Sequence, residues 1–103
     1  MPEYDALFAA VEGFDWDAGN TTKNVVGHGV SQSEAEAIFF HAPLLLLEDA
    51  KHSREEQRYL ILGTTGAGRL LTAAFTIRGP RIRIISVRDM SRKERQVYEE
   101  AAR

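Results

Sequence analysis

The chain has 103 residues, of which 44% are hydrophobic and none is cysteine. This length and composition are those of one globular domain, and they exclude a disulfide framework, a thiol nucleophile and a cysteine-based metal site. The longest aliphatic run, residues 44–47, is too short to span a membrane, and no signal peptide is evident, so we expect a soluble cytoplasmic protein.

The formal net charge is only −2, but the charge is unevenly distributed along the chain. Residues 1–68 hold 4 Lys and Arg against 11 Asp and Glu, a net of −7, whereas residues 69–103 hold 9 against 4, a net of +5. This asymmetry predicts a basic face on an otherwise acidic molecule, as in proteins that bind nucleic acid. The alternative is that the charges separate by element and mix again in space.

The N-terminal half predicts short helices and strands in alternation. Apolar residues at helical spacing predict a helix over residues 4–11, and the alternating residues 14–17 predict a short edge strand. A short helix is expected after Asp17 and ends near Gly27. Ser31 and Glu34 form a capping box that opens a helix over about residues 32–41. A buried strand at 44–47, a polar connection at 48–57 and a strand at 58–62 follow.

The stretch 69–88 predicts a β-hairpin whose loop is Gly79 with Pro80. In that register Arg78 faces Arg81 and Thr76 faces Arg83, while Ala74 faces Ile85, Ala73 faces Ser86, Thr72 faces Val87 and Leu71 faces Arg88. One face is then apolar near the turn and the other presents arginines. Like charges placed opposite each other destabilise a hairpin, so this cluster suggests an anionic partner; alternatively, each side chain reaches solvent by its own path.

Residues 63–68 resemble a phosphate loop only superficially, because they lack its lysine and both flanks predict strands; we expect a hairpin turn. A second capping box, Ser91 with Glu94, opens a C-terminal helix with an apolar side made of Val97, Tyr98 and Ala101. The whole chain, residues 1–103, is therefore predicted to be a single α+β domain: one antiparallel sheet of about four strands packed with helices.

Two groups of residues are candidates for chemistry. His28 lies between two glycines and titrates near neutrality, which suits an acid, a base or a phosphate ligand; the alternative is a histidine that caps or packs locally. Arg88, Arg92 and Arg95 would lie near the start of the last helix and, with Arg83 or Arg78, could form a phosphate-binding platform. The alternative is an exposed helix face with pairs such as Arg95–Glu99. The three histidines have no metal-ligand spacing, so we expect no metal and no cofactor.

Several stretches together resemble the BrnT toxin family. They are FDWD at 14–17, Lys23 with Asn24, the His28-Gly29-Val30 run before a Ser-capped helix, the polar segment from Asp49 to Arg58, and GRLLTAAFTIRGPRIRIISVRDMSRKERQVYE at 68–99. Each motif is weak alone, but their order and spacing are specific. The resemblance covers roughly residues 14–100 and leaves residues 1–13 as an accessory N-terminal helix.

The resemblance implies a RelE-like fold and the toxin of a type II toxin–antitoxin pair. It implies metal-independent endoribonuclease activity, in which the 2′-hydroxyl attacks the adjacent phosphate, and an inhibition of growth. The implied partners are RNA and a BrnA-like antitoxin, with DNA bound only through that antitoxin and no role for a membrane. In this reading the catalytic candidates are His28, Arg83, Arg88 and Lys23, with less direct help from Glu94. The RNA-binding candidates are Arg78, Arg81, Arg92, Arg95 and Tyr98.

One position departs from the family pattern. The family has a lysine before the His-Gly pair, and Gly27 stands there in this chain. The second hypothesis is therefore a catalytically inactive, toxin-like module that binds an antitoxin or nucleic acid.

Overall fold

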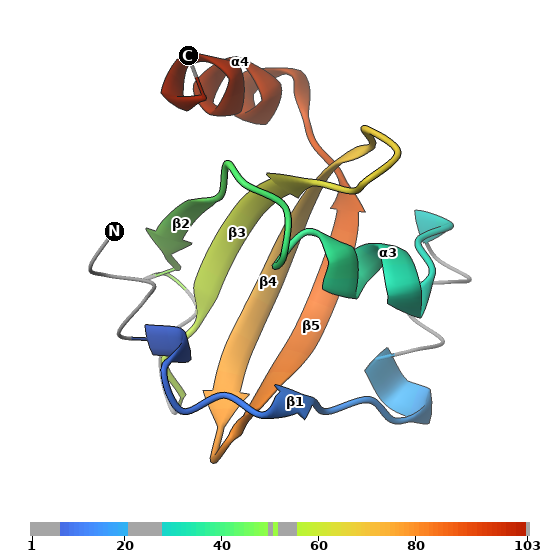
Figure 1. The fold of residues 1–103 in the computed structure, drawn as a ribbon, viewed down its shortest axis with the longest axis vertical. Helices are drawn as coiled ribbons and strands as arrows, with labels where there is room; N and C mark the ends of the chain where they lie inside the picture. The colour runs from blue at the N-terminus through green and yellow to red at the C-terminus, as the bar shows by residue number, and fades with distance from the viewer. Residues whose placement is uncertain (1–6, 21–27, 50, 52–55, 103) are drawn as a thin grey trace.

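The computed structural model describes residues 7–20, 28–49, 51 and 56–102. Its centre is a five-stranded sheet in the order β1-β5-β4-β3-β2 (Figure 1). The strands are β1 (Gly13–Phe14), β2 (Leu45–Glu48), β3 (Tyr59–Thr64), β4 (Leu70–Arg78) and β5 (Arg81–Asp89). The predicted α+β domain is confirmed, but the sheet of about four antiparallel strands is corrected to five strands of mixed direction.

The fifth strand is β1, which pairs parallel to β5 beside the hairpin turn. Backbone hydrogen bonds extend the pairing on both sides: the Glu12 amide donates to Pro80 O (2.6 Å) and the Asp15 amide to Ile82 O (2.8 Å). The edge strand predicted at residues 14–17 is present, but it is shorter and begins one residue earlier. Only Gly13 and Phe14 pair with β5 before the chain turns away from it. This pairing leaves no free edge on β5 near the turn.

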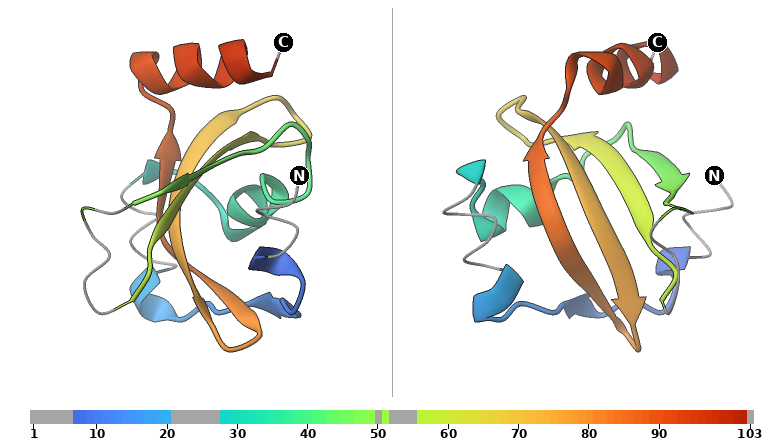
Figure 2. Two further views of the ribbon diagram at one scale, coloured as in Figure 1. Left: turned by 90° about the vertical axis from the view of Figure 1, so that its left-hand side faces the viewer. Right: turned by 180° about the vertical axis from the view of Figure 1, so that it is seen from behind.

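Helices cover the two faces of the sheet unequally. In Figure 1, α3 (Gln32–Ala37) and the N-terminal segment lie over one face, and α4 (Arg92–Ala101) crosses the end of the sheet. Seen from behind in Figure 2, β3, β4 and β5 are in full view below α4. We call this the open face. No helix among the described residues is long and apolar enough to cross a membrane.

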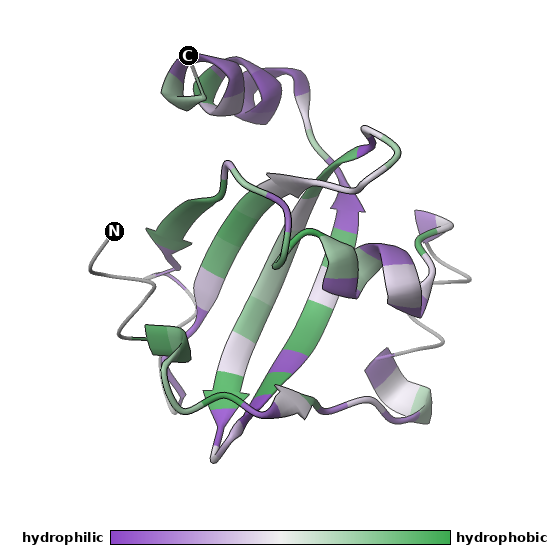
Figure 3. Cartoon of the chain, in the orientation of Figure 1, coloured by the Kyte–Doolittle hydropathy of each residue, from purple (hydrophilic) through white to green (hydrophobic). Residues whose placement is uncertain are grey.

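The covered face holds the main core. Phe75 of β4 is fully buried, and its ring centroid lies 5.2 Å from Phe39 and 5.4 Å from Tyr59. Phe8 and Phe14 of the N-terminal segment add their rings to the same cluster. Figure 3 shows the hydrophobic residues running along the middle of the strands, with hydrophilic ones at the turn. A smaller cluster of Leu62, Met90 and Tyr98 joins α4 to the sheet.

Both predicted capping boxes are confirmed: Ser31 with Glu34 opens α3, and Ser91 with Glu94 opens α4. The first helix is shorter than predicted, since α3 ends at Ala37 and residues 38–40 form a turn that buries Ile38 and Phe39. This turn packs so closely on β3 that a Cβ at Gly63 would lie 3.0 Å from the Ile38 carbonyl oxygen. A side chain at position 63 would therefore require the turn to shift.

Three further local predictions need correction. The N-terminal helix predicted over residues 4–11 is helical only at residues 7–8 among those described. The short helix predicted after Asp17 is not contradicted: residues 18–20 are helical, and residues 21–27 lie outside the described residues. The strand predicted as buried at 44–47 is the outer strand β2, whose Leu47 is 40% exposed because no strand covers its outer side. On α4 only Tyr98 packs into a core, whereas Val97 is 44% exposed.

The hairpin register is right near its turn and wrong beyond it. Gly79 has φ +59°, a value that glycine adopts without strain, and the four pairs from Arg78–Arg81 to Phe75–Ile84 are as predicted. A β-bulge at Ile85 then shifts the pairing, so that Thr72 faces Arg88 instead of Val87, and Leu71 faces Asp89. The extra residue keeps Val87 in the core and turns Arg88 to the open face.

Candidate functional site

The turn end of the hairpin gathers cations on the open face. A groove of about 250 Å³ lies there between the start of β3, the hairpin and the segment around Asn20. We call it the hairpin groove; its lining residues are Gly19, Asn20, Glu56, Arg58, Arg78, Arg83 and Ile85. It therefore combines three guanidinium groups with one aliphatic wall, a set that suits a phosphate group with an attached sugar or base.

Each of the two hairpin arginines in this groove is paired with carboxylates from the N-terminal part of the chain. Arg78 donates through Nε and Nη2 to the two oxygens of Glu56, at 2.7 and 3.0 Å. This bidentate contact is the main reason that the pKa of Glu56 lies below its ordinary value and the pKa of Arg78 above it. Glu56 is therefore an anion at neutral pH.

Arg83 is held by two acids. Its Nη1 lies 3.1 Å from Asp17 Oδ2 and 3.5 Å from Asp15 Oδ1, and only 18% of its side chain is exposed. The hydrogen bond from Arg83 is the largest cause of the lowered pKa of Asp17. Asp17 Oδ1 also accepts from the Gly19 amide at 2.9 Å, so the same carboxylate caps the short turn that follows.

Asn20 fixes this acidic segment against β5. Its buried side chain donates to Asp15 O (3.0 Å) and to Ile84 O (2.9 Å), and accepts from the Asp17 amide (2.8 Å). Backbone groups before and after Trp16 are therefore tied to the strand that carries Arg83. The contact between Arg83 and the two acids is built into the fold rather than left to mobile surface side chains.

The other end of β5 carries a separate constellation. Arg88 donates two hydrogen bonds to Glu94, at 2.7 and 3.0 Å, and Thr72 donates a third at 3.0 Å. Together with the Ser91 amide, these donors lower the pKa of Glu94 to about 2, Arg88 being the largest cause. Glu94 thus completes a helix cap and an ion pair, and does not titrate near neutrality.

His28 lies near this end of β5. It is exposed, and it is close enough to Asp89 to contribute to the lowered pKa of that carboxyl, although Arg69 is the main cause and Arg95 also contributes. The neighbouring Gly29 carbonyl accepts from Arg69, which also binds Glu34 at 3.1 Å and Asp89 at 2.8 Å. Arg69 therefore anchors the segment of His28 to both α3 and β5.

The predicted site residues are not gathered in a single groove. The strand partners of Arg83 and Arg88, Thr76 and Thr72, are four residues apart on β4, which is about 13 Å at the usual rise per residue. His28 lies with Asp89, which is turned to the face opposite Arg88. Lys23 and Gly27 lie outside the described residues.

Tyr98 needs a correction. Its side chain is only 5% exposed and its hydroxyl donates to Pro43 O at 2.8 Å, so the ring joins α4 to the sheet and is not presented to RNA. The exposed cations on the same helix, Arg92 and Arg95, make no ion pair with any residue that the structure describes, and the same is true of Arg81 at the hairpin turn.

The predicted basic face is largely neutralised. Three ion pairs join the basic C-terminal part to the acidic N-terminal part, because Arg69 binds Glu34, Arg78 binds Glu56 and Arg83 binds the Asp15–Asp17 pair. The alternative considered from sequence, that the charges mix again in space, therefore holds for these arginines. Among the described residues, cations without an ion pair remain at the hairpin turn, at Arg81, and in the N-terminal part of α4, at Arg92 and Arg95.

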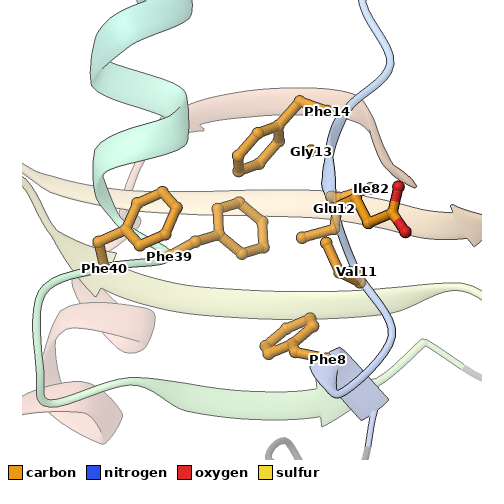
Figure 4. A pocket seen from close by; sticks show the side chains of 8 residues that line it. All are labelled: Phe8, Val11, Glu12, Gly13, Phe14, Phe39, Phe40 and Ile82. Atoms are coloured by element: carbon orange, nitrogen blue, oxygen red, sulfur yellow. The ribbon is translucent and has the colours of Figure 1, made fainter. Parts of the chain in front are cut away.

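A second hollow, of about 280 Å³, lies on the covered face and has a different character (Figure 4). Its walls are mainly rings and aliphatic groups, including Phe8, Phe14, Phe39 and Phe40, and the Glu12 carboxylate points away from it. Since no cation lines this hollow, it does not suit an RNA backbone.

A family model described as the ribonuclease toxin BrnT of type II toxin–antitoxin systems matches residues 16–94, most of the chain. The chain belongs to the BrnT family. The match includes the hairpin groove, the bulge and the start of α4, and it begins after β1. No curated protein matches the chain.

Membership in the BrnT family implies an RNA target and an antitoxin partner. The sequence pointed to the hairpin arginines, but not to the residues that organise them: Asn20, Arg69 and the acidic partners of the arginines. The signal that was present is the excess of acids in residues 1–68, which provides the partners of Arg78 and Arg83 and one partner of Arg69. The positions of those partners depend on the fold.

Proposed function

We propose that this chain is an endoribonuclease that binds the RNA backbone along the open face of its sheet. The observation that carries the proposal is that a ribonuclease-toxin family model covers the hairpin groove, where three guanidinium groups surround a space large enough for about one nucleotide. The unpaired cations on α4 extend the basic surface beyond the groove. An RNA strand that runs from Arg83 to Arg88 would span about 13 Å, or two to three phosphates, before it reaches α4.

The proposed chemistry is attack of the 2′-hydroxyl on the adjacent phosphate without a metal ion. Such a reaction needs a proton acceptor at the 2′-oxygen, a proton donor at the leaving 5′-oxygen, and cations around the phosphate. We assign the proton transfer to His28, because its ring is exposed and histidine is the side chain suited to proton transfer near neutral pH. Charge stabilisation is assigned to Arg83, Arg88 and Lys23; because Arg83 and Arg88 lie about 13 Å apart along β5, these two would contact different phosphates of the strand. Arg78, Arg81, Arg92 and Arg95 bind the strand.

The test is RNA cleavage by the purified protein in the presence of a chelator. His28→Ala should lower kcat at least tenfold, and Arg83→Ala should lower kcat/KM at least tenfold with a rise in KM, since the first would remove a proton carrier and the second a phosphate contact. His41→Ala is the matched control, because His41 is also exposed and its ring hydrogen-bonds to the Ala37 carbonyl, which is not part of the hairpin groove. Cleavage that is unchanged in both site variants would remove these assignments.

The partner in this proposal is a BrnA-like antitoxin that carries the DNA-binding activity of the complex. Expression of the chain alone should arrest growth, and co-expression of the antitoxin encoded beside it should relieve the arrest. Growth arrest that persists with the antitoxin would contradict the pairing.

A second candidate function is a toxin-like module that binds its partners without cleaving RNA. The observation that favours it is that Arg78, Arg83 and Arg88 are all engaged by carboxylates, so none is free to receive a phosphate as the fold stands. This function predicts tight antitoxin binding together with no cleavage and no growth arrest.

A further inference from the structure

The hairpin groove has three cations but no net charge. Arg58, Arg78 and Arg83 line it, and three carboxylates, those of Glu56, Asp15 and Asp17, lie in it or against Arg83. Two of these acids converge on one guanidinium. A phosphate that approaches Arg83 therefore meets an arginine that is already bound and a surplus negative charge beside it.

The two acids occupy the position that an RNA phosphate would need. Carboxylate oxygens bind guanidinium groups at the same distances and in the same fork geometry as phosphate oxygens. Asp17 contacts both terminal nitrogens of Arg83, at 3.1 and 3.2 Å, which is a bidentate contact of this kind. The Asp17 carboxylate therefore occupies the binding position on Arg83 that an RNA phosphate would take.

The backbone that carries Asp15 and Asp17 is held in place. The buried Asn20 side chain holds the backbone at Asp15 and Asp17 and bonds to β5 at Ile84, as described above. A phosphate can displace the carboxylates from Arg83 only by rotation of their side chains, and both charges then stay close to the bound phosphate.

We propose that Asp15 and Asp17 set the affinity and selectivity of the hairpin groove by competing with RNA phosphate for Arg83. This inference rests on the proposed RNA-binding function of that groove. A lone phosphate gains too little to displace two tethered carboxylates. A polynucleotide also contacts the unpaired cations at Arg81 and on α4, so the acidic pair makes the groove selective for a polyanionic strand over a mononucleotide.

The test uses an RNA oligonucleotide with 2′-O-methyl groups, which cannot be cleaved, and measures its affinity for Asp15→Asn and Asp17→Asn. Both changes keep the side-chain shape, and the amide oxygen introduced by Asp17→Asn would still accept from the Gly19 and Asn20 amides. Each variant should bind the oligonucleotide about three- to tenfold more tightly than the wild type, from the loss of one nearby negative charge. In the double variant the plot of log affinity against log salt should steepen by about 0.7, the value for one added phosphate contact on a single strand.

Glu48→Gln is the matched control, because Glu48 is an exposed acid on β2, at the edge of the sheet away from β5. The inference is overturned if the aspartate variants bind more weakly, which would mean that the acids orient Arg83 for RNA. It is also overturned if they gain no more than Glu48→Gln, or if no variant binds the oligonucleotide. Adding Arg83→Ala to Asp17→Asn should abolish the gain. Tighter binding by proteins that do not cleave unmodified RNA would refute the nuclease assignment and leave this inference standing.

Discussion

The two ends of β5 hold their arginines in different ways. At the turn end, Arg83 is bound by acids that lie 66 and 68 residues away in the sequence, held in place by Asn20. At the helix end, Arg88 is bound by Glu94, six residues away, which is also the capping residue of α4. The first arrangement depends on the complete fold, whereas the second is formed by neighbours along the chain.

This difference suggests a division of labour. The Arg88–Glu94 pair is shared with a helix cap and with Thr72, so a ligand that took Arg88 would weaken the start of α4. The acids on Arg83 are more exposed than Glu94, since 36% and 55% of their side chains are accessible against 23%, and neither acid belongs to a strand. The turn end is therefore the better place to exchange a carboxylate for a phosphate, and the helix end the better place for stability.

The largest expected effect is on the turn end. Asn20→Ala should lower the free energy of unfolding by about 3 kcal/mol, because it removes a buried hydrogen bond to the Ile84 carbonyl and part-buried ones to the backbone of Asp15 and Asp17. Urea unfolding followed by tryptophan fluorescence measures this, since Trp16 lies within the segment. Gln32→Ala, at an exposed position of α3, is the control and should change stability by less than about 0.5 kcal/mol. A loss of under about 1 kcal/mol in Asn20→Ala would show that the acidic segment is not held by this side chain.

The next effect compares the two ion pairs. Glu94→Ala should lower the free energy of unfolding by about 2 kcal/mol, because it removes both a capping interaction and hydrogen bonds to a charged group. Glu56→Ala should lower the free energy of unfolding by less than about 1 kcal/mol, since Glu56 forms only an exposed ion pair with Arg78. Glu94→Gln separates the terms, because glutamine keeps the capping box without the charge. If chemical unfolding shows that Glu94→Ala and Glu56→Ala lose the same free energy of unfolding, the helix end of β5 is not the more stabilising of the two.

The smallest expected effect concerns pH. The pKa of Glu94 is about 2 in the folded protein against an ordinary value of 4.5, so the unfolded chain takes up this proton first as the pH falls. The stabilisation is complete above about pH 5 and is lost towards pH 2, and it amounts to at most about 2 kcal/mol after solvent screening. The difference in unfolding free energy between wild type and Glu94→Gln should shrink over that range. A difference that is constant from about pH 7 to about pH 3 would show that the charge of Glu94 is not the cause.

In the hairpin, the strand register could be predicted from the sequence near the turn but not beyond the bulge. The pairs next to the Gly79-Pro80 turn follow from turn geometry and the alternation of Ile and Arg, and the structure confirms them. Beyond the bulge the prediction is wrong, because strict alternation would have brought Ser86 instead of Val87 to the covered face. The register that forms is the one in which Val87 is buried in the core, and in this register Arg88 lies beside Thr72 and Glu94.

The candidate site shows the same limit. The sequence identified the arginines of the hairpin and the terminal helix, but it placed them with His28 in one groove. In the structure they divide between the two ends of β5, and His28 lies near Asp89 and Arg69. Position along a strand is readable from spacing, whereas the face and the neighbour of each side chain depend on the bulge and on segments far away in the chain.

The sequence by itself determined the α+β class, both capping boxes, the hairpin turn and the family resemblance, because each of these depends on residues close together or on their order along the chain. The tertiary structure alone decided that β1 joins the sheet in parallel, that Tyr98 faces inward, and that acids from the N-terminal part neutralise Arg78 and Arg83 of the hairpin. Pairing between opposite charges depends on separations of a few ångströms, and residues as distant in sequence as Asp17 and Arg83 reach that separation only when the core has formed around them.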